Sequence, residues 1–206
     1  MRPAVGLARD VGLALVSLVA LAAVALALLT VRVDGLSMLP TLQDGDALIA
    51  DRFLLPWQSP HRGDLVVLLQ PNGVAVVKRV IAVPGDTIEI SDRTSPPGVR
   101  PSSPVVAIRP GGRGPWRRLV EPYVEPGWVR LGSCCDAQGR AVSGEPRPLN
   151  LPPGQYFVLG DNRNASLDSR EFGLVPRSRI VGLVLARYWP LDRAGALTAR
   201  PRLAAA

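Results

Sequence analysis

The sequence predicts a mainly β protein in which an N-terminal transmembrane helix precedes an antiparallel, barrel-like β domain with an inserted second β region. Two observations lead to this fold class. Residues 11–31 form a long apolar run without a charged side chain. Beyond them, short runs of β-branched residues alternate with turns rich in glycine and proline, and no stretch repeats its apolar residues with the period of a helix.

The N-terminal apolar run has the length of a membrane span. As a helix, residues 11–31 would extend about 31 Å, which matches a hydrocarbon core of roughly 30 Å. Residues 1–10 contain two arginines and only one aspartate, so we expect them in the cytoplasm, and everything from Arg32 onward outside it. The sequence therefore predicts a single-pass protein of the plasma membrane.

A cleaved secretory signal is the alternative interpretation of the same run, because residues 25–27 read Ala-Leu-Ala, a small-x-small site. The residues after this site, Leu28, Leu29 and Val31, are still apolar, whereas a mature chain normally begins with polar residues. A retained anchor is therefore favoured, and both interpretations export the rest of the chain.

Eight segments beyond the apolar run have the composition of strands, with β-branched and aromatic residues between turn residues. They cover residues 47–49, 65–69, 74–83, 87–90, 105–108, 128–131, 156–159 and 180–188, and one helical turn is expected at 176–179.

The composition changes between residues 91 and 150, where proline, glycine and arginine are frequent and the apolar runs are weaker. We interpret 91–150 as a second, looser β region. It would be inserted into a first domain made of residues 32–90 and 151–193, and residues 194–206 would form a flexible tail.

The net charge of +7 suits a domain that rests against anionic lipid headgroups. Nucleic acid is not expected as a partner, because no helix-turn-helix, zinc or aromatic-basic signature is present. Cys134 and Cys135 are adjacent, so they are not expected to bridge distant segments, and a vicinal disulfide or two free thiols are the open alternatives. Without a Cys/His cluster, neither a metal site nor a cofactor is expected. The oligomeric state is not predicted.

Lys78 is the only lysine among 24 basic residues, and all the others are arginine. A guanidinium stays protonated at any biological pH, whereas a desolvated ammonium can lose its proton. If residues 74–81 form a strand, Lys78 shares its face with valines, while Arg79 points to the other face. Burial there would lower the pKa of Lys78 until it can act as a base, whereas a lysine at the sheet edge would keep its amine in water.

Two polar segments could accompany such an amine. Ser37 lies in a turn just after the apolar run, between Gly35 and Pro40, where it would be accessible. Residues 160–170 carry two aspartates, two arginines and two serines, enough to hold another group in place, although a plain polar turn is the alternative for both segments. The only histidine, His61, lies in a predicted exposed turn, so a Ser-His-Asp triad is not expected, and lysine is the natural base for an exported serine.

Several separated motifs in the same order make the chain resemble the type I signal peptidases, the membrane-anchored Ser/Lys endopeptidases that remove signal peptides from exported proteins. The resemblance extends from the apolar run to about Arg193. It rests on residues 37–46 (SMLPTLxxGD), 62–64 (RGD), 78–86 (KRVIxxPGD), 121–124 (EPYV) and 160–170 (GDNRxxSxDSR).

The resemblance implies two catalytic residues, Ser37 as the nucleophile and Lys78 as the general base, and it makes Ser166 the hydroxyl that orients the amine. It also implies two ion pairs that hold the loop in place, Asp161 with Arg79 and Asp168 with Arg170.

The oxyanion hole implied by the resemblance uses the backbone N–H of Ser37. Some members of the family add a side-chain hydroxyl two residues upstream, but this position is Gly35 here, so the second donor is open. The implied substrates are precursors that carry a signal peptide, cleaved through an acyl-enzyme without a cofactor. The alternatives are a Ser/Lys peptidase dedicated to one conjugation or pilus substrate, and a non-catalytic membrane-anchored β scaffold.

Overall fold

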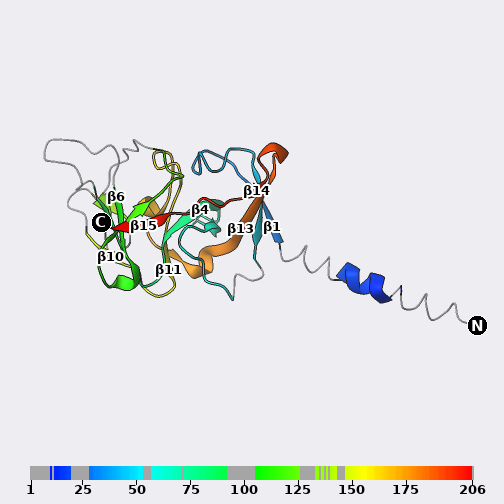
Figure 1. The fold of residues 1–206 in the computed structure, drawn as a ribbon, viewed down its shortest axis with the longest axis horizontal. Helices are drawn as coiled ribbons and strands as arrows, with labels where there is room; N and C mark the ends of the chain where they lie inside the picture. The colour runs from blue at the N-terminus through cyan, green and yellow to red at the C-terminus, as the bar shows by residue number, and fades with distance from the viewer. Residues whose placement is uncertain are drawn as a thin grey trace, which may run out of the picture.

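Two antiparallel sheets make up the body of the protein, and helical residues 12–19 project away from it (Figure 1). The computed structural model describes residues 10, 12–19, 28–52, 57–70, 72–91, 105–125, 133, 134, 136, 138, 140–142 and 147–205.

The first sheet has the strand order β1-β2-β13-β3-β4-β11-β12, and β14 pairs with β13. The bounds are β1 Leu28–Arg32, β2 Ala47–Asp51, β3 Leu65–Leu69, β4 Ala75–Ala82, β11 Gln155–Leu159, β12 Val175–Pro176, β13 Ile180–Trp189 and β14 Gly195–Ala196. In β3, Leu65 and Val67 enter one apolar core while Val66 and Leu68 enter another. The strand is apolar throughout because both of its faces are covered.

The second sheet has the order β15-β7-β6-β5-β8-β9, and β10 pairs with β5. The bounds are β5 Thr87–Ser91, β6 Val105–Arg109, β7 Arg117–Val120, β8 Ser133–Cys134, β9 Ala141–Val142, β10 Leu149–Asn150 and β15 Arg202–Ala205. Single helical turns η1 Pro110–Gly112, η2 Arg177–Arg179 and η3 Leu191–Arg193 and the short helix α2 Ser169–Phe172 connect strands.

The strand predictions are largely confirmed. The strand over 65–69 has the predicted bounds, and β2, β4, β5, β6, β11 and β13 differ from their predictions by one or two residues at an end. The helical turn predicted at 176–179 is η2. The strand predicted at 128–131 and Cys135 lie outside the described residues.

The inserted region is less separate than the sequence suggested. Ile81 of β4 and Phe157 of β11 share one apolar core with Ile88 of β5 and Ile108 of β6. The second sheet also takes β5 and β15 from outside residues 91–150. Its strands therefore pack on the first sheet through a common core, because each sheet has an apolar face to bury.

The predicted helix over 11–31 is wrong at its C-terminal end. Residues 28–31 belong to β1, whose backbone pairs with β2 from Leu28↔Asp51 to Arg32↔Ala47. Residues 12–19 are helical as predicted, and residues 11 and 20–27 are not among those described. Within the described residues, we find no helix with both the length and the apolar character that crossing a membrane requires.

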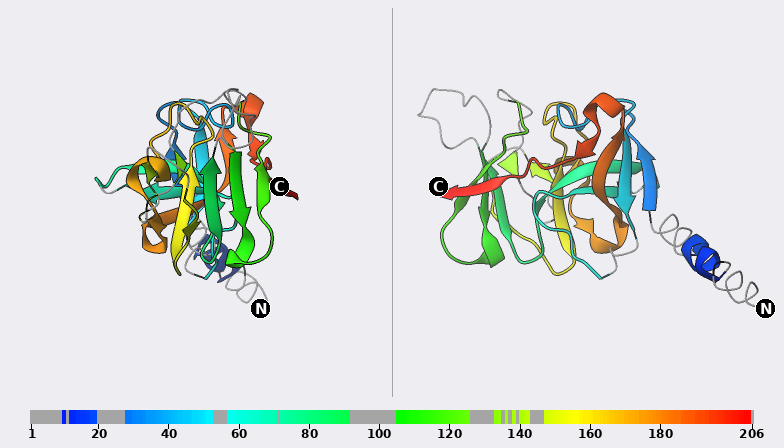
Figure 2. Two further views of the ribbon diagram at one scale, coloured as in Figure 1. Left: turned by 90° about the vertical axis from the view of Figure 1, so that its left-hand side faces the viewer. Right: turned by 45° about the vertical axis from the view of Figure 1, so that its right-hand side comes forward.

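The segment that we expect to be a flexible tail contains two strands, β14 and β15. β14 pairs with β13, and β15 pairs with β7 over four residue pairs. In Figure 2 the C-terminal segment, coloured red, runs from the first sheet to β15 at the edge of the second. Its backbone pairs with β13 in the first sheet and with β7 at the edge of the second. Leu203 also packs on the apolar core that the two sheets share.

Candidate active site

A tight turn after β1 presents Ser37. Gly35 has a φ of 101°, a conformation that favours glycine, and its N–H donates to Asp44 Oδ1 at 2.8 Å. The neighbouring side chains of Val33 and Met38 are buried in the core of the first sheet. These anchors leave Ser37 half-buried at the surface of the turn, where a substrate can reach it.

Lys78 lies in the middle of β4, and its amine Nζ is 2.7 Å from Ser37 Oγ. The residue is only 2% exposed, so the amine is not kept in water. Burial lowers the pKa of Lys78 from its ordinary 10.5 to about 8, with a smaller lowering by Arg170, while the carboxylates of Asp168 and Asp161 act to raise it. The amine is therefore in contact with the serine hydroxyl and much easier to deprotonate than an ordinary lysine.

The ion pair expected between Arg79 and Asp161 is present and fully buried. Arg79 Nε and NH2 donate to the two carboxylate oxygens of Asp161 at 2.8 and 2.6 Å. NH1 donates to the carbonyls of Gly63 and Ala199 at 3.0 and 2.7 Å. The ring of Tyr123 lies over the guanidinium, 3.8 Å from its carbon to the ring centroid. The guanidinium of Arg79 is therefore fixed by one carboxylate, two carbonyls and one aromatic ring.

The second expected pair, Asp168 with Arg170, is also present. Arg170 Nε and NH2 donate to Asp168 at 2.9 and 2.8 Å, and the N–H of Gly160 donates to the same carboxylate at 3.0 Å. Burial alone would raise the pKa of Asp168, but the hydrogen bonds and charge of Arg170, the Gly160 N–H and the Ser166 hydroxyl together lower it. Asp168 stays charged and caps helix α2.

The loop that carries Asp161 and Asp168 touches the backbone of Ser37. The N–H of Asn162 donates to the Ser37 carbonyl at 3.1 Å. A Cβ at Gly160 would lie 2.2 Å from Ser166 Oγ and 2.4 Å from the Ser37 carbonyl oxygen. Ser166 therefore lies next to the Ser37 backbone. Its hydroxyl helps to lower the pKa of Asp168, and its predicted orientation of the lysine amine stays a prediction.

Residues without a predicted role complete this network. Thr41 Oγ1 donates to Asp161 Oδ2 at 2.5 Å, which joins the Ser37 turn to the Arg79 pair. Thr41 lies inside a motif of the resemblance, which is the one signal that could have found it. The Ala199 carbonyl gave no signal, because any residue has one.

Residues 121–124, a motif for which the sequence predicted no role, also belong to this hydrogen-bond network. Tyr123 donates its hydroxyl to Glu121 at 2.9 Å, and Glu121 also forms an ion pair with Arg163. Arg163 Nε in turn donates to the Gly160 carbonyl at 3.1 Å. This segment follows β7 of the second sheet, so the second sheet helps to hold the loop that carries Asp161 and Asp168.

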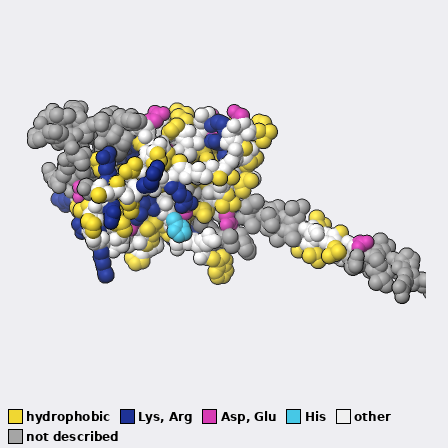
Figure 3. Space-filling model, viewed as in Figure 1, with side chains coloured by type: hydrophobic (Ala, Val, Ile, Leu, Met, Phe, Trp, Pro, Cys, Tyr) yellow, Lys and Arg dark blue, Asp and Glu magenta, His cyan; other side chains and the backbone are white. Residues whose placement is uncertain are grey.

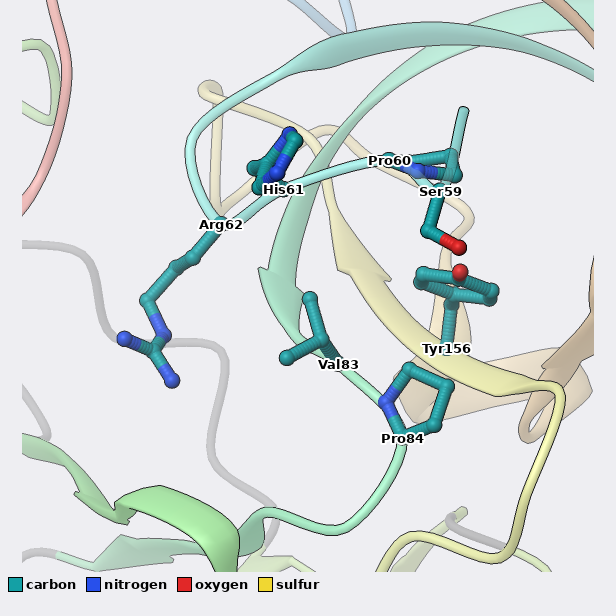
Figure 4. Close-up of a pocket in the computed structure, with 7 residues that line it drawn as sticks. All are labelled: Ser59, Pro60, His61, Arg62, Val83, Pro84 and Tyr156. Atoms are coloured by element: carbon teal, nitrogen blue, oxygen red, sulfur yellow. The ribbon is translucent and has the colours of Figure 1, made fainter. Parts of the chain in front are cut away.

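The exclusion of the histidine agrees with the structure. The side chain of His61 is 81% exposed, and it lies on the surface in Figure 3. It lines a recess of about 540 Å³ that Figure 4 shows, with Ser59 and Tyr156 facing each other and Arg62 extending away from them. The recess lies beyond the C-terminal end of β4, at Val83 and Pro84, and not at Ser37 and Lys78.

A hydroxyl in contact with a buried amine, held by two ion pairs on antiparallel strands, is the arrangement that a hydrolase with a serine nucleophile and a lysine base requires. A sequence profile of the family described as signal peptidase, peptidase S26, matches residues 8–189. The chain belongs to this family.

Known proteins similar to this chain carry the same family name. It is 33% identical over 171 residues to a probable signal peptidase I-1 of Synechocystis sp., covering 78% of this chain and 71% of that protein. It is 33% identical over 156 residues to signal peptidase I V of Bacillus subtilis, covering 74% and 81%. The crystal structure of a signal peptidase I from Enterococcus faecalis matches with 28% identity and a TM-score of 0.40, covering 61% of this chain and 97% of that one.

Proposed function

We propose that this protein is a membrane-anchored serine endopeptidase that removes N-terminal signal peptides from exported precursors. Ser37 is the nucleophile and Lys78 the general base. The observation that supports this most directly is the 2.7 Å contact between Lys78 Nζ and Ser37 Oγ, made by an amine that is 2% exposed. The relatives, which are signal peptidases I, support the substrate class. A non-catalytic scaffold would need no buried amine, and no observation favours a peptidase dedicated to one substrate.

The reaction follows from this contact. The neutral amine of Lys78 accepts the proton of the Ser37 hydroxyl while Oγ attacks the carbonyl carbon of the scissile bond. The ammonium then gives that proton to the leaving nitrogen, the carbon–nitrogen bond breaks, and the mature protein leaves. The signal peptide stays attached to Ser37 as an ester. Water attacks the ester while Lys78 accepts its proton. The bond between the acyl carbon and Ser37 Oγ then breaks, Oγ takes the proton from Lys78, and the signal peptide is released as an acid.

The backbone N–H of Ser37 is the first donor to the oxyanion. Among the described residues it donates to no other group, so it is available to the intermediate. One such donor is worth about 3–4 kcal/mol of barrier. Gly35 has no hydroxyl, and its N–H already donates to Asp44, so we assign no second donor.

An extended precursor segment fits the free edge of β4. β11 pairs with β4 only between residues 79 and 82, so residues 75–78 have no strand partner on that side within the described part of the chain. Backbone pairing along this edge would bring the scissile bond to Lys78 and Ser37. We expect alanine-sized side chains at the first and third residues before that bond, because the strands around the site are rich in aliphatic residues.

A membrane anchor is supported by the exposed apolar helix. The side chains of residues 13, 15, 16, 18 and 19, all leucine or valine, are 58–68% exposed. Such a surface is unfavourable in water and favourable in lipid. Exposed arginines such as Arg117, Arg118 and Arg202 add positive charge that anionic headgroups attract, and part of this charge is visible in Figure 3. The N-terminus would lie in the cytoplasm and the sheets outside it.

Cleavage of a precursor with an Ala-x-Ala site tests the assignment. With the full chain in detergent, Ser37→Ala and Lys78→Arg should each reduce kcat by roughly 1000-fold or more, because each removes a group that acts in the chemical step. Lys78→Arg keeps the charge, so a scaffold would tolerate it. Ser178→Ala, at an exposed serine in η2, is the matched control and should cleave normally. Undiminished cleavage by Lys78→Arg would contradict the proposal.

A further inference from the structure

Residues 197–205, which we name the C-terminal strap, connect the two sheets on the outside of the protein (Figure 2). The strap follows β14, which pairs with β13, and it ends in β15, which pairs with β7. The family profile ends at residue 189, so the strap lies beyond the matched region.

The strap is anchored at both ends and in the middle. Leu197 packs on the core of the first sheet and Leu203 on the core shared by the two sheets. Between them, Arg200 forms an ion pair with Asp64 at 2.9 Å. A Cβ at Gly63 would lie 2.6 Å from Pro201 Cδ, so the proline ring rests directly on this turn. These contacts fix the backbone of the strap just before β15.

The fixed backbone places the carbonyl of Ala199 on Arg79. This carbonyl accepts a hydrogen bond from Arg79 NH1 at 2.7 Å, and the Gly63 carbonyl accepts the other bond from NH1 at 3.0 Å. Both acceptors at NH1 are therefore supplied by the strap and by the turn on which it packs. Ala199 and Arg200 are exposed while Arg79 is only 1% exposed, so the strap separates the guanidinium from water.

Arg79 also holds the turn after β1 that carries Ser37. Its Nε and NH2 donate to Asp161, and the same carboxylate accepts the hydroxyl of Thr41, four residues after Ser37. An ion pair kept away from water is stronger and more precisely oriented than a hydrated one, provided that all of its donors are satisfied. A donor of Arg79 left to water would loosen Asp161 and, through Thr41, the turn that carries Ser37.

We propose that the C-terminal strap is a positioning element for the reaction, in which the Ala199 carbonyl accepts one N–H of Arg79 NH1 and thereby helps to hold Ser37 at Lys78. This inference rests on the proposed function. It predicts that loss of the carbonyl lowers kcat and leaves KM nearly unchanged, because the free edge of β4 that would bind the substrate is not part of the strap.

Two shortened chains separate residues 199–201, which place the carbonyl on Arg79, from the strand β15 that follows them. A chain that stops after Thr198 lacks Ala199, whereas a chain that stops after Pro201 keeps Ala199, the Arg200–Asp64 pair and the proline contact. Both lack β15, so any general effect of that strand is matched. We call the chain that ends at Thr198 the Thr198 form and the chain that ends at Pro201 the Pro201 form. Per folded molecule, we expect the kcat of the Thr198 form to be lower than that of the Pro201 form by about tenfold or more. The KM values of the two forms should be similar. Thermal unfolding followed by tryptophan fluorescence establishes the folded fraction.

Equal kcat values in the two shortened chains would overturn the proposal, whether both are active or both are impaired. If the Thr198 form does not fold, full-length Arg200→Glu replaces it, because a carboxylate facing Asp64 would push the strap away. Arg200→Lys keeps the ion pair and should retain kcat, whereas Arg200→Glu should lose several-fold. A wild-type kcat for Arg200→Glu would then overturn the proposal.

A second readout does not depend on cleavage. Because Lys78 is the only lysine, lysine labelled with 13C at Cε gives a single side-chain NMR signal at the active site. This signal should shift at constant pH in the Thr198 form relative to the Pro201 form, and an unchanged signal would count against the strap. If no form of the protein cleaves a precursor, the proposed function fails while this comparison still tests the strap.

Discussion

Cleavage should depend steeply on pH, because only the neutral form of Lys78 can accept the proton of Ser37. Burial lowers the pKa of this amine from 10.5 to about 8. At pH 7 the neutral fraction is therefore ~9%, compared with ~0.03% for an ordinary lysine. The burial of Lys78 in the sheet thus gives a gain of roughly 300-fold in the active form of the enzyme at this pH.

The direction of the effect follows from the base role. Below the pKa of Lys78 the amine is protonated, so kcat/KM should fall about tenfold for each pH unit below pH ~7 and level off above pH ~9. The assay is the cleavage of a fluorogenic peptide with an Ala-x-Ala site at constant ionic strength, between about pH 5.5 and 9.5. The 13C signal of Lys78, titrated in parallel, should have its midpoint at the same pH as the rate. A rate that is flat down to about pH 5.5, or an NMR midpoint near the ordinary lysine value, would refute the buried base.

Three further predictions concern stability and packing. Lys78→Met should increase the free energy of unfolding by ~3 kcal/mol at pH 7. The folded pKa of about 8 lies below the unfolded value of 10.5, so the wild type carries the full penalty below pH 8 and loses it as pH rises from 8 to 10.5. Asp161→Asn should cost ~3–5 kcal/mol, because it leaves the buried charge of Arg79 without its partner. Gly160→Ala should lower kcat more than ~100-fold with a normal circular dichroism spectrum, since its Cβ would lie 2.2 Å from Ser166 Oγ.

Denaturant unfolding measures the two expected changes in stability, and peptide cleavage measures the expected loss of kcat. A Lys78→Met variant no more stable than the wild type at pH 7, or an advantage that grows toward pH 9.5, would contradict the burial penalty. An Asp161→Asn variant of unchanged stability would show that Arg79 is satisfied without a carboxylate. A fully active Gly160→Ala variant would show that the loop can move away from Ser37 at no cost.

The strands were predictable because their signal is local. Residues 65–69 and 180–188 have β-branched and apolar residues between clear turn residues, and they form β3 and β13 with nearly the predicted bounds. The end of the apolar run gave a misleading signal. Residues 28–31 are as apolar as a membrane helix, but their backbone pairs with β2, and no composition distinguishes these two environments.

The long-range contacts were not predictable from residue patterns. Ser37 and Lys78 are 41 residues apart in sequence. The lack of a suitable histidine favoured lysine as the base for the serine, and the family resemblance assigned the two roles. The ion pair of Arg79 and Asp161 joins residues 82 apart and came from the same source. The bond from Arg79 to the Ala199 carbonyl had no signal in the sequence, because it uses a backbone group in a segment without a periodic pattern.

The chain carries its positive charge as arginine everywhere except at Lys78. Reagents that acylate or carbamoylate amines attack the neutral form, and guanidinium groups do not compete for them at neutral pH. Such a reagent, if small enough to enter beside Ser37, would find a single amine side chain in this protein, so an adduct mapped to residue 78 by peptide mass spectrometry would report the neutral amine of the site. An inhibitor that carries a mild amine-directed electrophile could exploit the same selectivity.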